Sequence, residues 1–275
     1  MNGKIKLGSI GILRAASAAC AAELEQWAFR GCGRELDENR DCDGEAFIAA
    51  NGLSCDDSAV LFLPPLVRGP GRPNTLYFGT DRLYRSSDRG ETMRVVSQQF
   101  RPAVAVSAIG IAPGDDRIRL VGLADGRLFL TISGSSPLAE VTRAIPNGFV
   151  ARIVIDPADP AVAYVTLDAY AGQEVWKTTD LTSGHPTWQP AGEGLPNIPV
   201  NGFVIDPGDS QHLFAGTDIG VFYSANGGAQ WVPFSNGLPR LPVFDIGFQG
   251  TQRVLRIATH GRGIWEITPP AAGLR

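Results

Sequence analysis

The sequence predicts an all-β protein, a β-propeller with about four complete four-stranded blades and a partial fifth. Two observations carry this prediction. An internal repeat recurs every 42 to 50 residues, and short apolar runs are separated by Gly, Pro, Asn and Asp at intervals too short for helices. A repeat of this length built from β-type segments is typical of propeller blades, none of which can bury its faces alone. The repeat therefore determines the fold and says little about function.

Two columns of residues fix the register of the repeat. The column that ends the first strand of each blade has intervals of 44, 44, 50 and 43 residues and holds Arg68, Ala112, Asp156, Asp206 and Gln249. The column that follows the second strand has intervals of 44, 43, 50 and 42 residues and holds Asp81, Asp125, Asp168, Asp218 and His260. Because both columns keep the same spacing, we expect residues 57–267 to form consecutive blades, with any helix confined to about residues 15–28.

The fourth blade shows the expected strands most clearly, at Val200–Ile205, Leu213–Thr217, Gly220–Ser224 and Trp231–Phe234. The fifth blade ends after its third strand, at about Ile267, and residues 268–275 form a tail. An unpaired strand edge invites aggregation unless something covers it. We therefore expect part of Ala46–Leu53, or the segment before it, to pair with or cover that edge. The alternative is that the chain is a fragment of a larger propeller.

The turn between the third and fourth strands, which we call the rim turn, carries the most specific motif. Residues 86–93 match the pattern Ser-x-Asp-x-Gly-x-Thr-aromatic except at Met93, residues 224–231 repeat it with Asn for Asp, and residues 178–188 are a copy stretched by an insertion. In such a turn Asp or Asn bonds its own backbone, Gly accepts a positive φ and the aromatic residue packs between blades. A structural role is therefore predicted for Ser86, Asp88, Gly90, Asp180, Trp188, Ser224, Asn226, Gly228 and Trp231.

On these turns, the chain resembles the family of Asp-box, or bacterial neuraminidase repeat, propellers found in exported bacterial proteins. Residues 57–267 look like the carboxy-terminal part of such a propeller. The resemblance implies an extracellular or periplasmic protein, related by fold to sialidases, xyloglucan-cleaving glycoside hydrolases, sortilin-type receptors and a photosystem II assembly factor. That group mixes enzymes with binding proteins, so the resemblance leaves the activity open.

Composition narrows the class of partner. The 275 residues are 44% hydrophobic, enough for the core of one β-rich domain. The net charge of −4 and the absence of a basic run argue against nucleic acid, whose binding requires Lys and Arg to neutralise phosphates. No apolar stretch reaches the roughly 20 residues of a membrane span. The partners expected are therefore a glycan or a protein, and the oligomeric state is left open.

The first 56 residues form a separate, irregular segment. Lys4 and Lys6 precede an apolar run and an Ala-rich stretch, as in a signal peptide, but Arg14 interrupts it, and a misplaced start is the alternative. All four cysteines lie here: Cys20, Cys32, Cys42 and Cys55. They suit one or two disulfides of an exported protein, with three pairings open, or they are free thiols.

A run of oxygen-bearing side chains in this segment resembles the first half of a calcium loop. Asn39, Asp41 and Asp43 alternate and end in Gly44, which places hard oxygen ligands at every other position. Ala50 stands where the loop needs its bidentate acid, so the alternative is a solvated acidic turn. No other cofactor is expected.

The second column also suggests a ligand-binding face. In a propeller the loops between second and third strands share one face with the loops between blades, while the rim turns lie on the opposite side. We call this face the ring face. The candidate binding residues there are Asp81, Asp125, Asp168, Asp218, His260 and Arg262. The alternative is that Asp recurs because its side chain stabilises tight turns.

Catalysis would need more than a ring of turns. Glycoside hydrolysis requires two carboxyl groups about 5 Å apart for retention or about 6.5–9.5 Å for inversion, and nothing in the sequence shows that two ring residues face each other. Tyr170 and Glu174 could imitate the tyrosine–glutamate pair of sialidases, and His260 could be a general acid or base or only a turn residue. We therefore expect a non-catalytic module that binds protein or glycan, with a glycoside hydrolase using the acidic residues of this face as the alternative.

Overall fold

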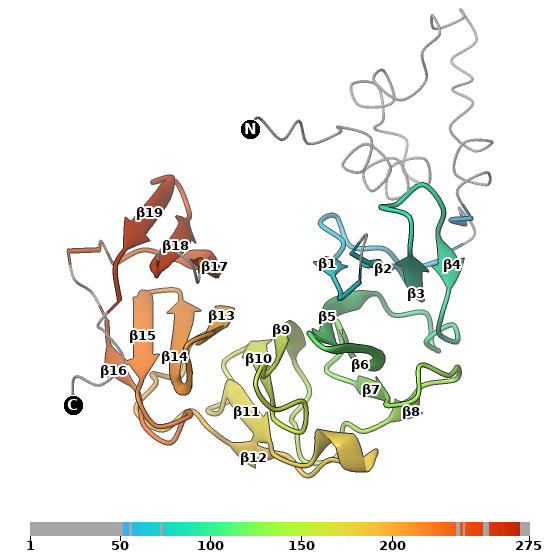
Figure 1. The fold of residues 1–275 in the computed structure, drawn as a ribbon. Coiled ribbons are helices and arrows are strands. Elements are labelled where there is room, and N and C mark those ends of the chain that lie inside the picture. Colours follow the sequence, from blue (N-terminus) through green and yellow to red (C-terminus); the bar gives the residue numbers. More distant parts are fainter. Residues whose placement is uncertain are drawn as a thin grey trace, which may run out of the picture.

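The computed structural model describes residues 52–54, 57–71, 74–234, 237–238, 240–249 and 253–269. Within them the chain forms five antiparallel sheets, which follow one another in an arc (Figure 1). The first four sheets have four strands each and the fifth has three, and strands adjacent in sequence are neighbours in every sheet. The predicted propeller of four complete blades and a partial fifth is confirmed.

The strands of each sheet are given in chain order. Blade 1 contains β1 (Leu66–Arg68), β2 (Leu76–Gly79), β3 (Leu83–Ser86) and β4 (Arg94–Val95). Blade 2 contains β5 (Val106–Ala112), β6 (Asp115–Leu123), β7 (Leu128–Thr131) and β8 (Ala139–Glu140). Blade 3 contains β9 (Phe149–Ile155), β10 (Ala163–Asp168), β11 (Val175–Thr178) and β12 (Gln189–Pro190). Blade 4 contains β13 (Val200–Asp206), β14 (Asp209–Thr217), β15 (Gly220–Ser224) and β16 (Val232–Pro233), and blade 5 contains β17 (Val243–Gln249), β18 (Val254–Thr259) and β19 (Ile264–Ile267).

The expected strands of blade 4 agree closely with the observed ones. β15 has the predicted bounds, whereas β14 begins at Asp209 because the Asp209 carboxylate closes a tight turn by accepting the Gln211 N–H at 3.0 Å. The inserted stretch of the third rim turn forms a short 3₁₀ turn, Leu181–Ser183, which ends at Gly184 with a φ of 78°. Residues 15–28, to which any helix was expected to be confined, lie outside the described part of the chain, as do the four cysteines and the calcium-loop residues.

The hydrophobic core lies between blades and is held by a repeated close contact. A valine at the start of a first strand packs against a glycine on the second strand of the preceding blade. A Cβ on the glycine would lie 2.5 or 2.6 Å from the valine side chain in the pairs Gly79–Val106, Gly122–Val150 and Gly216–Val243. Blade 3 has Thr166 at this place, and its hydroxyl donates to the Val200 carbonyl at 2.8 Å. The valine and glycine columns therefore fix the spacing of the blades.

Each of the first strands β5, β9, β13 and β17 carries a β-bulge at the same point of the repeat. One residue in each is left without a cross-strand partner: Ser107, Ala151, Asn201 and Phe244. Their intervals of 44, 50 and 43 residues follow the period of the two sequence columns. A bulge re-aims a side chain, and in blade 4 it directs Asn201 to the ring face.

The rim turns have the hydrogen bonds that the motif predicts. In the first, Asp88 accepts the Thr92 N–H at 2.9 Å and the Thr92 hydroxyl at 2.6 Å, while the Ser86 hydroxyl accepts the Gly90 N–H at 2.8 Å. Asp180 accepts the same two bonds from Thr187, across the insertion, at 2.8 and 3.0 Å. These acidic residues are thus engaged within their own turns.

The fourth rim turn keeps this geometry with an amide in place of the carboxylate. Asn226 Oδ1 accepts the Gln230 N–H at 2.9 Å, and the Ser224 hydroxyl accepts the Gly228 N–H at 3.0 Å. The tryptophans that close the third and fourth turns, Trp188 and Trp231, are buried between blades.

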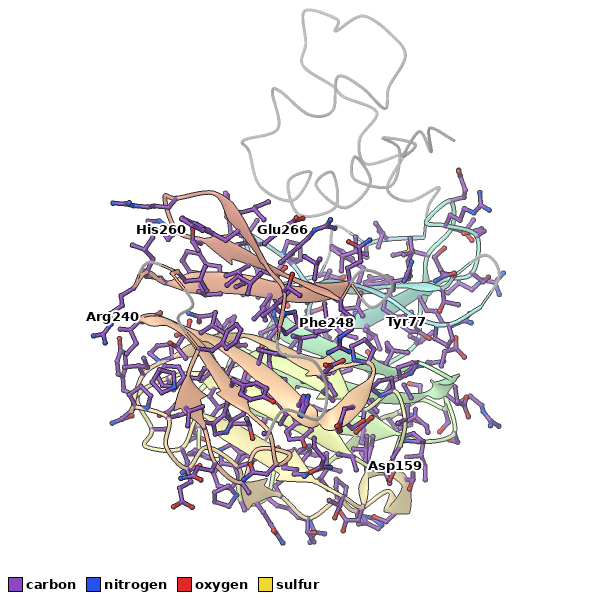
Figure 2. All side chains as sticks on the ribbon, turned by 60° about the vertical axis from the view of Figure 1, so that its left-hand side comes forward. Tyr77, Asp159, Arg240, Phe248, His260 and Glu266 are labelled. Carbon is purple, nitrogen blue, oxygen red and sulfur yellow. The ribbon has the colours of Figure 1, made fainter. Side chains whose placement is uncertain are left out.

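The outer face of blade 5 differs from the faces that join the blades. At one position of the second strand, blades 1 to 4 place a buried side chain against the next blade: Tyr77, Leu120, Tyr164 and Phe214. Blade 5 has Arg256 there, exposed, and it donates to Glu266 of the neighbouring strand at 2.7 Å. Figure 2 shows Glu266 on the side of blade 5 that faces away from blade 4.

At the other end of the arc, the chain before β1 lies on blade 1. The Asp57 carboxylate accepts the hydroxyls of Tyr84 at 2.7 Å and Thr80 at 2.6 Å. Gly52 lies so close to Met93 that a Cβ would be 2.2 Å from its carbonyl oxygen. The described end of Ala46–Leu53 therefore contacts blade 1. The rest of that segment lies outside the described residues, so the covering of the blade 5 edge stays a prediction.

Candidate ligand-binding face

The two sets of loops expected to share a face do so. Figure 2 places His260, from the second-to-third-strand loop of blade 5, and Arg240, from the loop before that blade, at the same end of the strands. Asp159, from the first-to-second-strand loop of blade 3, lies at the opposite end. The ring face is therefore defined by the loops that hold the second sequence column.

Asp81 is in the interior and not on this face. Its side chain is fully buried, and Oδ2 accepts the N–H and the hydroxyl of Ser58 at 3.0 and 2.8 Å and the Gln99 amide at 2.8 Å. The Arg82 guanidinium lies 3.3 Å from Asp57 and 3.7 Å from Asp81. This carboxylate attaches the chain before β1 to blade 1.

Asp125 is half-buried and paired within its own hairpin. Its carboxylate accepts Arg127 Nε at 2.8 Å, and the same guanidinium donates to the Arg101 carbonyl at 2.8 Å. This ion pair ties the loop of blade 2 to the loop between blades 1 and 2.

Asp168 of blade 3 and Asp218 of blade 4 lie on adjoining blades, at the ring-face ends of their second strands. Asp168 is the last residue of β10, and Asp218 directly follows β14. Although Asp168 remains exposed, partial burial of its carboxylate raises its pKa, and the charge of Asp218 raises it further. Asn201, at the bulge of β13, donates to Asp218 Oδ1 at 3.0 Å and orients it. Two adjoining blades thus each contribute one carboxylate to this part of the ring face, the seam of blades 3 and 4.

The loop after Asp168 extends this seam. It is the longest of the described second-to-third-strand loops, and the Gly172 N–H ties it down by donating to Glu174 Oε1 at 2.8 Å and Asn197 Oδ1 at 2.9 Å. Glu174 is only 2% exposed, and burial raises its pKa. Tyr170 is 70% exposed. The proposed tyrosine–glutamate pair is thus divided between the surface and the interior.

A polar contact also connects the first strands at the centre of the arc. Arg152 of β9 forms an ion pair with Asp245 of β17 and donates to the Phe244 carbonyl at 3.4 Å, so it reaches from blade 3 to blade 5. Sequence reasoning missed Arg152, Asn201 and Asn197. The bulge column, one residue before Arg152 and at Asn201, is the signal that could have located the first two.

His260 and Arg262 lie at the surface of blade 5. The His260 ring meets the Phe244 ring edge-on at a centroid distance of 5.4 Å, and the Arg262 carbonyl accepts the Trp265 indole N–H at 3.1 Å. Both residues belong to a tight hairpin loop, and their part in ligand binding stays a prediction.

Within the described ranges, no three His, Cys, Asp or Glu side chains are arranged to hold a metal ion. The candidate calcium ligands Asn39, Asp41 and Asp43 lie outside those ranges. Nor does the described part of the chain contain a helix of the length and apolarity needed to span a membrane.

No protein-family model and no curated protein matches this chain. Among solved structures it is similar to the Cps50 (Swd1) β-propeller domain of Myceliophteria thermophila, with 14% identity, a TM-score of 0.58, and coverage of 78% of this chain and 71% of that one. It is also similar to an ancestral GH74 enzyme, with 16% identity, a TM-score of 0.57, and coverage of 76% and 31%. A third match is the extracellular domain of a B. thetaiotaomicron protein described as a hybrid two-component system, with 16% identity, a TM-score of 0.53, and coverage of 72% and 26%.

At these identities the likeness shows the β-propeller fold alone. The chain spans less than a third of the length of the second and third matches.

Proposed function

We propose that this chain is a non-catalytic β-propeller module that binds a glycan or protein ligand on the ring face, at the seam of blades 3 and 4. The observation that carries the proposal is the pair Asp168 and Asp218, held on adjoining blades with Asn201 fixing one of them. The charge of Asp218 helps to raise the pKa of Asp168, and a ligand that donates hydrogen bonds to these carboxylates would offset that repulsion.

The chemistry around this pair suits the hydroxyl groups of a glycan. Carboxylates and the Asn197 and Asn201 amides supply acceptors and donors, and the exposed ring of Tyr170 offers an apolar surface beside them. The loops that carry these groups rise from paired strands, so the polar groups are held in place while the loop sequence is free to vary.

We further propose that the chain is an exported protein of the Asp-box type. The hydrogen bonds of the three rim turns support this, as does the extracellular domain among the propellers of similar fold. These similarities concern fold and turn geometry, and the proposal of a ligand rests on the seam alone.

A glycoside hydrolase is the second candidate, because one specific observation favours it. Burial and the charge of Asp218 raise the pKa of Asp168, which suits a general acid, and Asp218 is the candidate for the second carboxylate that glycoside hydrolysis requires. Incubation of the full chain with a polysaccharide panel and a sialoside reporter tests this function. Release of product that Asp168→Asn and Asp218→Asn both abolish would replace the binding proposal with catalysis.

Binding is tested by screening the full chain on a glycan array and titrating the strongest hit by calorimetry. Asp218→Lys should raise the dissociation constant about 10-fold or more, as expected when one charge-assisted contact is lost. The matched control is Asp159→Lys, an exposed turn carboxylate at the opposite end of the strands. Equal effects of the two substitutions would show that the seam is only a set of turns.

A further inference from the structure

A polar cavity lies between blades 3 and 4 on the side of the rim turns, opposite the ring face. Its volume is about 200 Å³, roughly six or seven times the volume that one water molecule takes up in the liquid. It therefore has room for one small molecule. Its polar lining comes from Lys177, Thr187, Gln189, Asn226 and the backbone of residues 227–229.

Lys177 occupies a position of the repeat at which blade 1 has a cation in an ion pair. In blade 1 this position is Arg85, which forms a 2.6 Å ion pair with Asp116 near the start of the second strand of blade 2. The residue of blade 4 equivalent to Asp116 is Ser210, and its hydroxyl donates to Asp156 at 2.7 Å. The repeat has lost the carboxylate that would pair with Lys177, and within the described residues Lys177 forms no ion pair.

A second departure from the repeat removes negative charge from the other wall of the cavity. The rim turns of blades 1 and 3 use Asp88 and Asp180, whereas blade 4 has Asn226 at the equivalent place. Asn226 Oδ1 takes over the turn bond to the Gln230 N–H. The second polar atom of the side chain is thereby an amide N–H donor where the other turns have a carboxylate oxygen.

The ammonium of Lys177 is fixed and partly stripped of water. It donates to the Gly227 carbonyl at 3.0 Å and lies 5.3 Å from the centre of the Tyr164 ring, whose hydroxyl donates to the same carbonyl at 3.0 Å. Burial lowers the pKa of Lys177, and the charge of Asp156 opposes that effect. The neighbouring Asp180 carboxylate accepts bonds within its own turn. A charged amine held in this way gains most from an anion that enters the cavity.

We propose that this cavity binds the carboxylate of a small organic acid, sugar acids included, with Lys177 as the cation and the Asn226 amide as a neutral donor. Two independent departures from the repeat support this: Asn226 replaces a carboxylate in the cavity lining, and Ser210 leaves Lys177 without the ion pair that Arg85 has in blade 1. The site lies on the opposite side of the blades from the ring face, so its ligand is separate from the one proposed there.

The test is calorimetric titration of the full chain with acetate, D-glucuronate, D-glucose and inorganic phosphate, at low ionic strength. We expect saturable one-to-one binding of glucuronate, weaker binding of acetate and none of neutral glucose. Lys177→Met should weaken glucuronate binding at least about 10-fold, because it keeps the aliphatic stem and removes the charge. Asn226→Asp should weaken it by a similar factor while restoring the residue that the other rim turns use, so this variant is expected to fold.

The matched control is Arg117→Met, an exposed arginine of blade 2 paired with Asp115, and it should leave the affinity unchanged. Thermal unfolding of each variant confirms that it is folded before titration. The proposal is overturned if neither carboxylate shows saturable binding up to about 100 mM, which is about 100-fold above a dissociation constant of about 1 mM. It is also overturned if both Lys177→Met and Asn226→Asp bind like the parent, or if phosphate binds more tightly than either carboxylate.

Discussion

Trp231 of blade 4 donates its indole N–H to the backbone carbonyl of Ala191 in the loop that follows blade 3, at 2.7 Å. Trp188 makes the equivalent bond one blade earlier, to the Val141 carbonyl at 3.1 Å. The tryptophan that closes a rim turn thus joins its blade to the preceding one through both packing and a buried hydrogen bond. This position connects a local turn motif to the assembly of the propeller.

Trp231→Phe should lower the free energy of unfolding by about 1–3 kcal/mol, because the buried Ala191 carbonyl loses its donor. Chemical denaturation monitored by circular dichroism measures the change. Trp265→Phe is the matched control, since Trp265 is partly exposed and bonds within its own hairpin, at the Arg262 carbonyl. If Trp265→Phe were as destabilising as Trp231→Phe, the loss of stability could not be assigned to the hydrogen bond between blades.

Asp88→Ala should destabilise the protein by about 1 kcal/mol, the usual net contribution of a turn hydrogen bond. Asp88→Asn should do less, because Asn226 already performs the turn role in blade 4. Ligand binding on the ring face should be unaffected by both substitutions. A variant with an unchanged melting temperature and lost binding would contradict a purely structural role.

Gly216→Ala should destabilise by about 1–3 kcal/mol, the typical effect of forcing extra volume into a packed site. Its new Cβ would lie 2.5 Å from the Val243 side chain. Gly247→Ala is the control: it is also a strand glycine, exposed, with nothing within 4 Å of an added Cβ. Thermal melts of the two variants should differ clearly, and similar melts would argue against the valine–glycine contact between blades.

Asp168→Asn should raise the stability at neutral pH. The pKa of Asp168 is raised above its ordinary 3.8, so its favourable contribution is present below pH 3.8 and is lost as the pH rises through the raised value. The variant should therefore melt above the parent at pH 7, and the difference should vanish near pH 3. A lower melting temperature at both pH values would show that the carboxylate has a structural role.

The rim turns should lose stability as the pH falls, whereas the contribution of Asp168 is lost as the pH rises. Hydrogen bonds from Ser86 and Thr92 lower the pKa of Asp88 from 3.8 to about 2. Its contribution to stability is then present above pH 3.8 and lost as the pH falls through 2. An acid titration of the parent and of Asp88→Asn should show a shallower loss in the variant, and identical curves would exclude this carboxylate as a source of acid sensitivity.

The fold was predictable because the residues at the ends of the first strands and those after the second strands recur with nearly the same spacing in every blade. Asp206, for example, ends the first strand of blade 4 and Asp218 follows the second, as expected, and the third strand there has the predicted bounds. Strand ends were harder to place. The turn at Asp209 is closed by a side-chain bond that lets β14 begin earlier than its apolar run.

The environments of the ring-face residues were less predictable than the fold, because residues at equivalent positions of the repeat have different neighbours. Asp81 is fully buried and accepts hydrogen bonds from Ser58 in the chain before β1, whereas Asp168 is exposed and its pKa responds to the charge of Asp218 on the next blade. Asn201 points to the seam of blades 3 and 4 only because β13 bulges beneath it. Both effects depend on contacts between segments that are distant in sequence, and the sequence of a single strand does not reveal such contacts.

The pair Arg256 and Glu266 has a consequence for solubility. Two copies of an arc with matching ends could stack head to tail, and because such a contact does not close on itself, it would grow into fibres. The Arg256 position holds a large buried side chain in each of the other blades, and its charged pairing with Glu266 gives any incoming blade a polar surface that it must strip of water. Substitution of both residues by the Phe and Tyr that blade 4 carries there would make the exposed end of this arc self-adhesive.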